Sequence, residues 1–236
     1  MINKKNTVMN VHISRQFHQE LELIRSQLLE MGGLVEQQMQ HAMQALLQAD
    51  SGLAQQVRKQ DKQVNQLQLQ LDELCTQVLA RRQPAASDLR LVLAVIRATA
   101  DLERMGDEAS KIARASLSLT EANLPMEAPL EGDLEQLGQQ VRQMLNKVLN
   151  AFARFDVQRA REVIAADDQV DQLYRRLCQE WLKQMQEQPT QLPKMMEMMW
   201  VLRSLERLGD HASNLAEMLI YLVEGQDVRY RPTPAS

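Results

Sequence analysis

A segment of nine residues occurs twice in this chain, about one hundred residues apart. Residues 102–110 read Leu-Glu-Arg-Met-Gly-Asp-Glu-Ala-Ser, and residues 205–213 read Leu-Glu-Arg-Leu-Gly-Asp-His-Ala-Ser. A second pair of segments is also similar, with Asp-Lys-Gln-Val-Asn-Gln-Leu at residues 61–67 and Asp-Asp-Gln-Val-Asp-Gln-Leu at residues 167–173. The chain is therefore an internal duplication, and each copy is expected to form the same supersecondary unit.

The composition predicts that both copies are all-α. Only 8 glycines and 7 prolines occur in 236 residues, and aromatic residues make up 3% of the chain. Leu, Ala, Gln, Met, Glu and Arg are the common residues, and these favour helices, whereas the β-branched and aromatic residues typical of strands are few.

Six long helices are expected, three in each copy. In the second of them, Val57, Val64 and Leu71 recur at intervals that place them on one buried face. Ser87 is expected to cap the start of the third helix, and Gly225 the end of the sixth. The expected helices cover about residues 14–48, 53–82, 87–119, 134–155, 157–187 and 194–225.

The repeat divides the chain into two three-helix bundles. The copies align with an offset of 106 residues through the second and fifth helices, and of 103 residues through the third and sixth. Short turns make neighbouring helices antiparallel, so each bundle is expected to run up, down and up. The expected boundaries are a first bundle at 1–122, a linker at 123–132, a second bundle at 133–225 and a mobile tail at 226–236.

Charge and hydropathy argue against several classes of function. The net charge is −4 and no dense basic stripe is present, so nucleic-acid binding is not favoured. No apolar run reaches the roughly 18 residues of a membrane span, and the first ten residues lack the apolar core of a signal peptide. We therefore expect a cytoplasmic protein. Cys75 and Cys178 are expected to be reduced, buried thiols, because neither has a Cys or His at ligand spacing.

Each repeated segment contains a Glu-x-x-x-Asp pair. Glu103 and Asp107 lie four residues apart in the first copy, as do Glu206 and Asp210 in the second. Residues at this spacing share one face of a helix, and two like charges there cost about 0.2–0.5 kcal/mol. A sequence that keeps such a pair in both copies is expected to place positive charge beside it.

A glycine lies inside each acidic pair, at Gly106 and Gly209. Glycine in a helix interior costs about 1 kcal/mol relative to alanine. The close approach of another helix would explain why both copies accept this cost.

Salt bridges are the first explanation for the acidic pairs. Basic residues lie three or four positions from these acids on the same helices: Arg104, Lys111, Arg203 and Arg207. Intrahelical ion pairs of this kind are common and need no metal.

A carboxylate cluster that binds a metal ion is the second explanation. Hard cations bind several carboxylate oxygens, and metal sites in helical bundles take acids from facing helices. The second helix offers Asp61 with Asn65, and the fifth offers Asp167 with Asp171. Because no Glu-x-x-His motif accompanies them, a di-iron oxidase site is not favoured.

Other candidate ligands have simpler interpretations. His211 follows Asp210 directly, so it is turned about 100° away from that acid, and we expect a histidine on the surface or packed between helices. The methionines that precede it on the last helix are expected to pack in the core or at an interface: Met195, Met196, Met198 and Met199. The sequence contains no nucleophile elbow and no phosphate-cradling glycine loop.

With these motifs, the chain resembles the PhoU family of bacterial phosphate-transport accessory proteins. Besides the two Glu-Arg-[Met/Leu]-Gly-Asp segments, further stretches carry the resemblance along almost the whole chain: residues 12–17, 31–36, 82–92, 151–156 and 225–227. The resemblance implies two similar three-helix bundles joined end to end, in a homodimer or a larger assembly.

The resemblance also implies a regulator and not an enzyme. Members of this family couple the nucleotide-binding subunit of a phosphate ABC transporter to a membrane sensor histidine kinase, and they repress the phosphate starvation response when phosphate is plentiful. Such a protein meets the membrane only through its partners. A metal-storage or metal-dependent redox protein is the alternative function, and a purely structural helical scaffold is a third.

Some members of the family carry iron, manganese or magnesium ions on the Glu-x-x-x-Asp motifs, with no organic cofactor. By motif match, the candidate metal ligands here are Glu103, Asp107, Glu206 and Asp210, supported by Asp61, Asp167 and Asp171.

The two copies differ at positions beside these acids. Asn65 in the first copy corresponds to Asp171 in the second, and Lys111 corresponds to Asn214. A lysine four residues after Asp107 is expected to neutralise the first acidic face. The sequence therefore predicts unequal metal sites, the second being the stronger.

Overall fold

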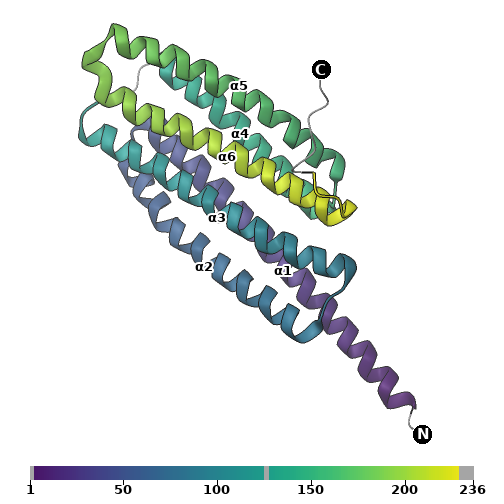
Figure 1. Cartoon of the computed structure of the whole chain (residues 1–236). Helices are drawn as coiled ribbons and strands as arrows, with labels where there is room; N and C mark the ends of the chain where they lie inside the picture. The colour runs from purple at the N-terminus through teal and green to yellow at the C-terminus, as the bar shows by residue number, and fades with distance from the viewer. Residues whose placement is uncertain (1–2, 125–127, 229–236) are drawn as a thin grey trace, which may run out of the picture.

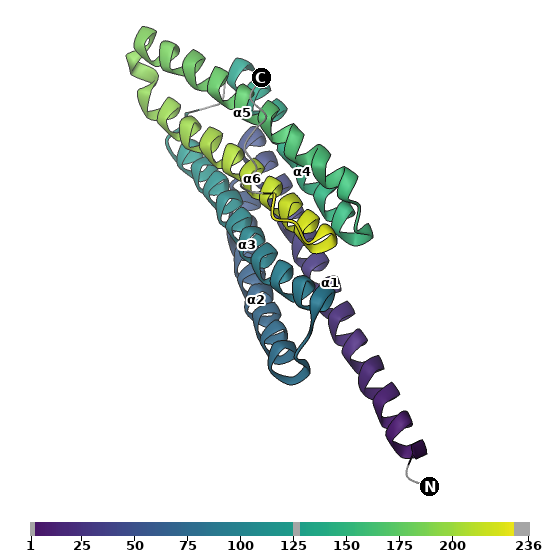
Figure 2. The ribbon, with the colours of Figure 1, turned by 45° about the vertical axis from the view of Figure 1, so that its right-hand side comes forward.

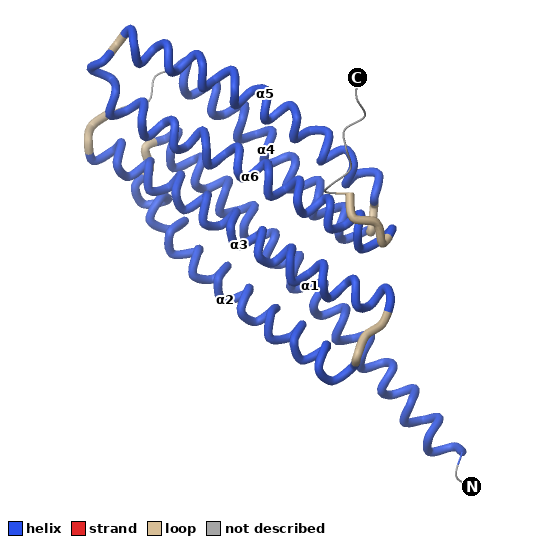
Figure 3. The backbone as a smooth tube through the Cα atoms, viewed as in Figure 1, coloured by secondary structure: helices blue, strands red, loops and turns tan. Residues whose placement is uncertain are grey.

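The structure is a computed structural model that describes residues 3–124 and 128–228, and the predicted all-α fold is confirmed in it (Figure 1). Within these residues the chain contains helices, one short 3-10 turn and loops, with no strand (Figure 3). The elements are α1 (Asn3–Gln48), α2 (Ser51–Arg82), α3 (Ala86–Glu121), α4 (Ala128–Arg154), α5 (Val157–Glu187), η1 (Pro189–Gln191) and α6 (Leu192–Glu224).

Two helices begin earlier than the sequence predicts. α1 begins at Asn3 and not near residue 14, since no glycine or proline interrupts its first turns. α4 begins at Ala128, inside the predicted 123–132 linker, and Pro129 and Gly132 lie in its first turns instead of ending a linker. Proline is tolerated there, where a backbone N–H has no partner inside the helix. Of the predicted mobile tail, residues 229–236 lie outside the described part.

The two copies begin their second helix with the same cap. An Asp50 side-chain oxygen accepts a hydrogen bond from the backbone N–H of Leu53 at 2.9 Å, and Asp156 accepts one from Arg159 at 3.1 Å. These contacts satisfy backbone donors that the first helical turn leaves unpaired. The matching caps confirm the offset of 106 residues between α2 and α5.

The predicted Ser87 cap is wrong, whereas the Gly225 cap is confirmed. α3 begins at Ala86 with Ala85 in the capping position, and no side chain caps it. Ser87 already lies within the helix, so its hydroxyl cannot act from the preceding turn. Gly225 ends α6 with φ 71°, the left-handed conformation that glycine adopts without a steric penalty.

The two bundles lie side by side, not end to end (Figures 1 and 2). α3 and α6 are adjacent along their length, with α2 outside α3 and α5 outside α6. α1 and α4 form the rear of the two bundles and also contact each other. The end-to-end expectation fails because α3 and α6 are apolar on more than one face, and such helices must be covered by several neighbours.

The sulfur-containing residues belong mainly to the interior. Met195 and Met198 are buried, which confirms core packing for them, whereas Met196 is exposed. Both cysteines are free thiols. Cys75 is fully buried, and this burial raises its pKa to about 12, while Cys178 is only half-buried. None of the helices in the described residues is long and apolar enough to span a membrane.

Candidate metal-binding site

The glycine of each acidic pair marks a close approach between two helices of a bundle. A Cβ atom on Gly106 would lie 3.3 Å from the Val64 side chain and 3.5 Å from Asp61 Oδ1. A Cβ atom on Gly209 would lie 3.2 Å from Val170 and 3.3 Å from an oxygen of Asp167. The predicted close approach is confirmed, and it brings acids from α2 towards α3 and acids from α5 towards α6.

In the second repeat, the structure brings three of the predicted acids together. One carboxylate oxygen from each of Asp171, Glu206 and Asp210 lies within 4.8 Å of the other two. Glu206 is 8% exposed, and its Oε2 atom is buried without a hydrogen-bond partner. Burial raises the pKa of Glu206, and the charge of Asp210 raises it further. A buried carboxylate that has an unpaired oxygen and two other acids close by is an arrangement that a cation would stabilise.

Asp167 is the fourth acid of this group. Burial raises its pKa to about 6, with further contributions from the charges of Asp210 and Asp171. Its Oδ1 atom is also buried and has no hydrogen-bond partner. Asp167 therefore lies within electrostatic reach of two of the clustered acids, Asp171 and Asp210, and one helical turn along α5 from Asp171.

The first repeat has the same acids but a different arrangement. Burial raises the pKa of Glu103, with smaller contributions from Asp107 and Asp61. These three acids therefore interact electrostatically. The described part of the first repeat nevertheless contains no three acids as close together as the trio in the second repeat. Asp61 instead accepts a hydrogen bond from the buried side chain of Gln38 at 3.2 Å.

Salt bridges account for only part of the second group. Arg203 pairs with Glu206, as the sequence predicts, and Arg175 pairs with Asp171, which it does not predict. Arg207 contacts Glu108 of α3 at 3.0 Å instead of the acid on its own helix. The cluster therefore keeps acidic oxygens that the neighbouring arginines leave unpaired.

The sequence predicts that Lys111 pairs with Asp107, but in the structure it does not. Its amine lies 2.9 Å from Glu108, three residues earlier, so it neutralises the buried acid at the contact between the bundles. Its charge still lowers the pKa of Asp107, against the larger effect of burial and the effect of Asp61. The first acidic group is thus less directly neutralised than expected.

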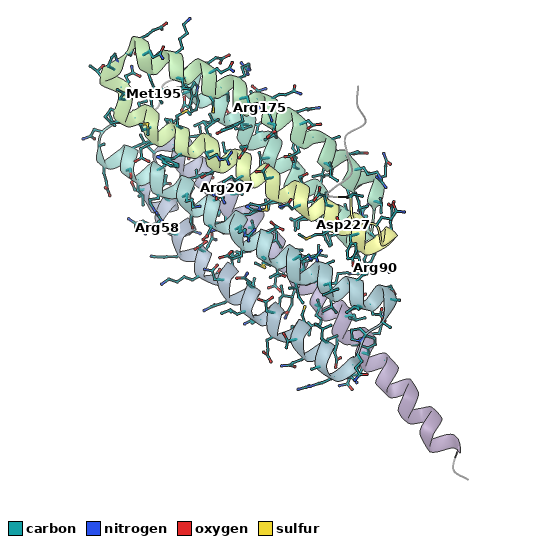
Figure 4. The ribbon with its side chains drawn as sticks, viewed as in Figure 1. Arg58, Arg90, Arg175, Met195, Arg207 and Asp227 are labelled. Atoms are coloured by element: carbon teal, nitrogen blue, oxygen red, sulfur yellow. The ribbon has the colours of Figure 1, made fainter. Side chains whose placement is uncertain are left out.

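Polar contacts between the two bundles were not predicted from the sequence. His211 is buried, and its Nδ1 atom lies 2.8 Å from an oxygen of Asp101, which Asn214 also contacts at 3.2 Å. Arg207, labelled on α6 in Figure 4, reaches across to Glu108 of α3. His211 therefore packs between helices, in agreement with one of the two roles expected for it. A comparison of equivalent positions would have flagged this residue, because His211 replaces Glu108 in the repeat.

The residues that fit a metal ion are therefore those of the second repeat. Asp171, Glu206 and Asp210 bring carboxylate oxygens close together, and the charges of Asp171 and Asp210 act on Asp167 beside them. These carboxylate oxygens are hard ligands suited to magnesium, manganese or ferric iron.

Comparisons with known proteins match both halves of the chain. The PhoU domain family matches residues 28–116 and 134–219, which include both acidic groups. The phosphate-specific transport system accessory protein PhoU homolog of Pseudomonas putida is 49% identical over 98% of this chain and 88% of its own length. The PhoU accessory protein of Escherichia coli K12 is 43% identical over 94% of this chain and 91% of its own length.

Two crystal structures share the fold. PhoU from Pseudomonas aeruginosa superposes with a TM-score of 0.85 at 49% identity, covering 89% of this chain and all of that one. The phosphate transport system regulatory protein PhoU from Streptococcus pneumoniae gives a TM-score of 0.83 at 33% identity, covering 90% of this chain and 99% of that one.

The two acidic groups are expected to differ in metal affinity. Glu206→Gln/Asp210→Asn should weaken manganese or ferric iron binding about tenfold more than Glu103→Gln/Asp107→Asn. The reason is that this second-repeat variant loses two of the three clustered carboxylates. Titration calorimetry on metal-free protein measures both. Equal losses, or a greater loss in the first-repeat variant, would show that the trio does not determine affinity.

Asp167 should make stability depend on pH. Its pKa is raised from 3.8 to about 6 in the folded protein, so between these values the unfolded chain releases a proton that the folded chain keeps. Stability therefore falls as pH rises through this window. In metal-free protein, Asp167→Asn should be more stable than wild type at pH 7, and the difference should shrink towards pH 4.

Urea unfolding at several pH values measures this difference. Glu180→Gln, which alters an exposed acid farther along α5, is the control and should leave the pH dependence unchanged. A stability difference that is the same at every pH would contradict the assignment.

Proposed function

The chain belongs to the PhoU family, and from this premise we propose that it represses the phosphate starvation response and modulates phosphate uptake. The observation that carries the proposal is the match of almost the whole chain to accessory proteins of the phosphate-specific transport system. In this role the protein is an adaptor between the nucleotide-binding subunit of the phosphate ABC transporter and a sensor histidine kinase. It acts by binding and not by catalysis, as a cytoplasmic homodimer that meets the membrane only through these partners.

An adaptor needs an exposed contact surface, and the second repeat offers one. Four apolar side chains lie exposed near the α5–α6 turn, the end at which Met195 is labelled in Figure 4: Leu182 (51% exposed), Leu192 (41%), Met196 (48%) and Trp200 (65%). Residues 192, 196 and 200 are four apart and share one face of α6. In the first repeat, Arg97 occupies the position equivalent to Trp200. The tryptophan at the end of this apolar row is therefore a feature of the second repeat.

We assign this patch to the transporter's nucleotide-binding subunit, because the relatives' names describe accessory proteins of the transport system. Contiguous exposed apolar side chains are typical of protein interaction sites, and tryptophan is enriched among residues that carry binding energy.

A metal-storage or metal-dependent redox protein is the second candidate, and the acid trio of the second repeat is the observation that favours it. The trio consists of carboxylates only, whereas di-iron redox sites in helical bundles also use a Glu-x-x-His histidine. We therefore propose that a bound iron, manganese or magnesium ion serves the regulator's structure or its contacts.

Deleting the gene from its host tests the regulatory function. An alkaline phosphatase reporter under phosphate control should then be active in high phosphate, because the repressing adaptor is missing. Supplying the wild-type gene in trans should restore repression. A deletion strain that still represses the reporter, in a host without a second copy of the gene, would refute the proposal.

Trp200→Arg should weaken capture of the transporter's nucleotide-binding subunit by the purified protein at least tenfold, since it places the first repeat's arginine into the apolar patch. Leu69→Arg is the matched control, because Leu69 is an exposed apolar residue (69%) on α2 of the first repeat. Circular dichroism verifies that both variants fold. Equal capture by both variants would show that the subunit binds elsewhere.

A further inference from the structure

One buried amide ties the first acidic group to the rest of its bundle. Gln38 of α1 is fully buried, and its Nε2 atom donates to Asp61 Oδ1 at 3.2 Å. The same nitrogen lies 3.3 Å from the carbonyl oxygen of Gly106 and 3.4 Å from the hydroxyl of Ser110. The reverse orientation of the amide would set its oxygen against these acceptors. Gln38 thus connects α1 to the acid of α2 and to the backbone between the acids of α3.

The second repeat has the same surroundings without the amide. The matching caps fix the offset of 106 residues through the first two helices of each repeat, so Met144 occupies the position of Gln38, and Asp167 that of Asp61. Met144 is 3% exposed, and its side chain has nearly the length and shape of glutamine but no N–H to donate. Accordingly, Asp167 Oδ1 is buried without a partner.

The backbone does not explain this difference. A valine methyl group and an aspartate oxygen lie beside both Gly106 and Gly209 at similar distances, and the Oε1 atom of Gln38 is an additional neighbour of Gly106 alone. The change from glutamine to methionine is therefore the feature that separates a paired aspartate oxygen from an unpaired one.

We propose that the residue at this position, Gln38 or Met144, decides which repeat accepts a hard cation. The amide of Gln38 takes one acceptor site of Asp61 and directs its positive N–H at the first acidic group, whereas Met144 leaves Asp167 Oδ1 available to a cation or to its bound water. The proposal rests on the metal binding proposed for the second repeat, not on the regulatory function.

The preference follows from what a cation meets at each aspartate. At Asp61 it meets the positive end of the Gln38 amide, whose nitrogen lies 3.2 Å from the same oxygen. A cation beside Asp167 instead pairs an oxygen that otherwise has no partner. The thioether of Met144 does not compete for the site, because hard cations select oxygen over sulfur. Gln38 and Met144 are therefore positioning residues and not ligands.

Exchanging the two residues tests the proposal, one repeat at a time. Met144→Gln in the Glu103→Gln/Asp107→Asn background, which leaves only the second group intact, should weaken manganese binding about tenfold. Gln38→Met in the Glu206→Gln/Asp210→Asn background should strengthen manganese binding by the first group about tenfold. Titration calorimetry, with the paramagnetic resonance spectrum of bound manganese, reports affinity and coordination together.

Gln37→Met is the matched control, because it makes the same chemical change on the exposed neighbour of Gln38 and should leave affinity unchanged. Measuring stability as well distinguishes a specific loss of manganese affinity from a general loss of folding. Metal-free Met144→Gln should unfold at a higher urea concentration than its parent, because the new amide pairs the Asp167 oxygen.

Greater stability together with weaker manganese binding supports the proposal. Unchanged manganese affinity in Met144→Gln overturns it, whether or not the Gln38→Met variant folds. Failure of the wild-type protein to bind manganese would overturn this inference, while the reporter experiment on the regulatory function would be unaffected.

Discussion

The close contact of helices at Gly106 and Gly209 is the constraint on which the acidic groups depend. Because neither glycine has a side chain, α3 can approach α2, and α6 can approach α5, until carboxylates from both helices face one another. Bringing like charges together beneath the surface raises their pKa values and disfavours their ionised forms. The two repeats differ at this point, since the amide of Gln38 pairs Asp61 in the first, whereas Asp167 Oδ1 in the second has no hydrogen-bond partner.

The contact between α3 and α6 makes the two bundles one unit. Helices with apolar residues on several faces cannot be covered within a three-helix bundle, so each becomes the principal partner of the other. Charged groups are buried in this contact, yet each has a partner: Glu108 has two cations, and Asp101 has an imidazole and an amide. Such groups are stable only as complete sets, since a buried charge without its partner costs several kcal/mol, of the order of 3–5.

The fold was predictable because it depends on properties repeated over many residues. Helical periodicity, the scarcity of glycine and proline, and the duplication each indicate six helices in two bundles. The acids of the site were predictable for the same reason, since Glu206 and Asp210 recur with their spacing. Contacts made by one residue were not predictable. The roles of Gln38 and Met144 depend on how α1 and α4 are rotated, and periodicity does not fix rotation closely enough to align one amide with one carboxylate. The side-by-side packing was missed because it requires knowing which apolar face is left uncovered.

The run of contacts along α3 and α6 has a consequence for the duplication itself. Contacts from Asp101 to His211 and from Glu108 to Arg207 move in opposite directions along the two helices, so the helices are antiparallel and the repeats are related by an approximate two-fold axis. Two separate copies of a single repeat, assembled about a two-fold axis, would have to make every contact twice.

In a fused chain the two symmetry-related contacts can be made by different residues. Glu108 has an arginine and a lysine as partners, while His211, at the same repeat position, has an aspartate. Fusion therefore allowed the two sides of one symmetric contact to specialise independently.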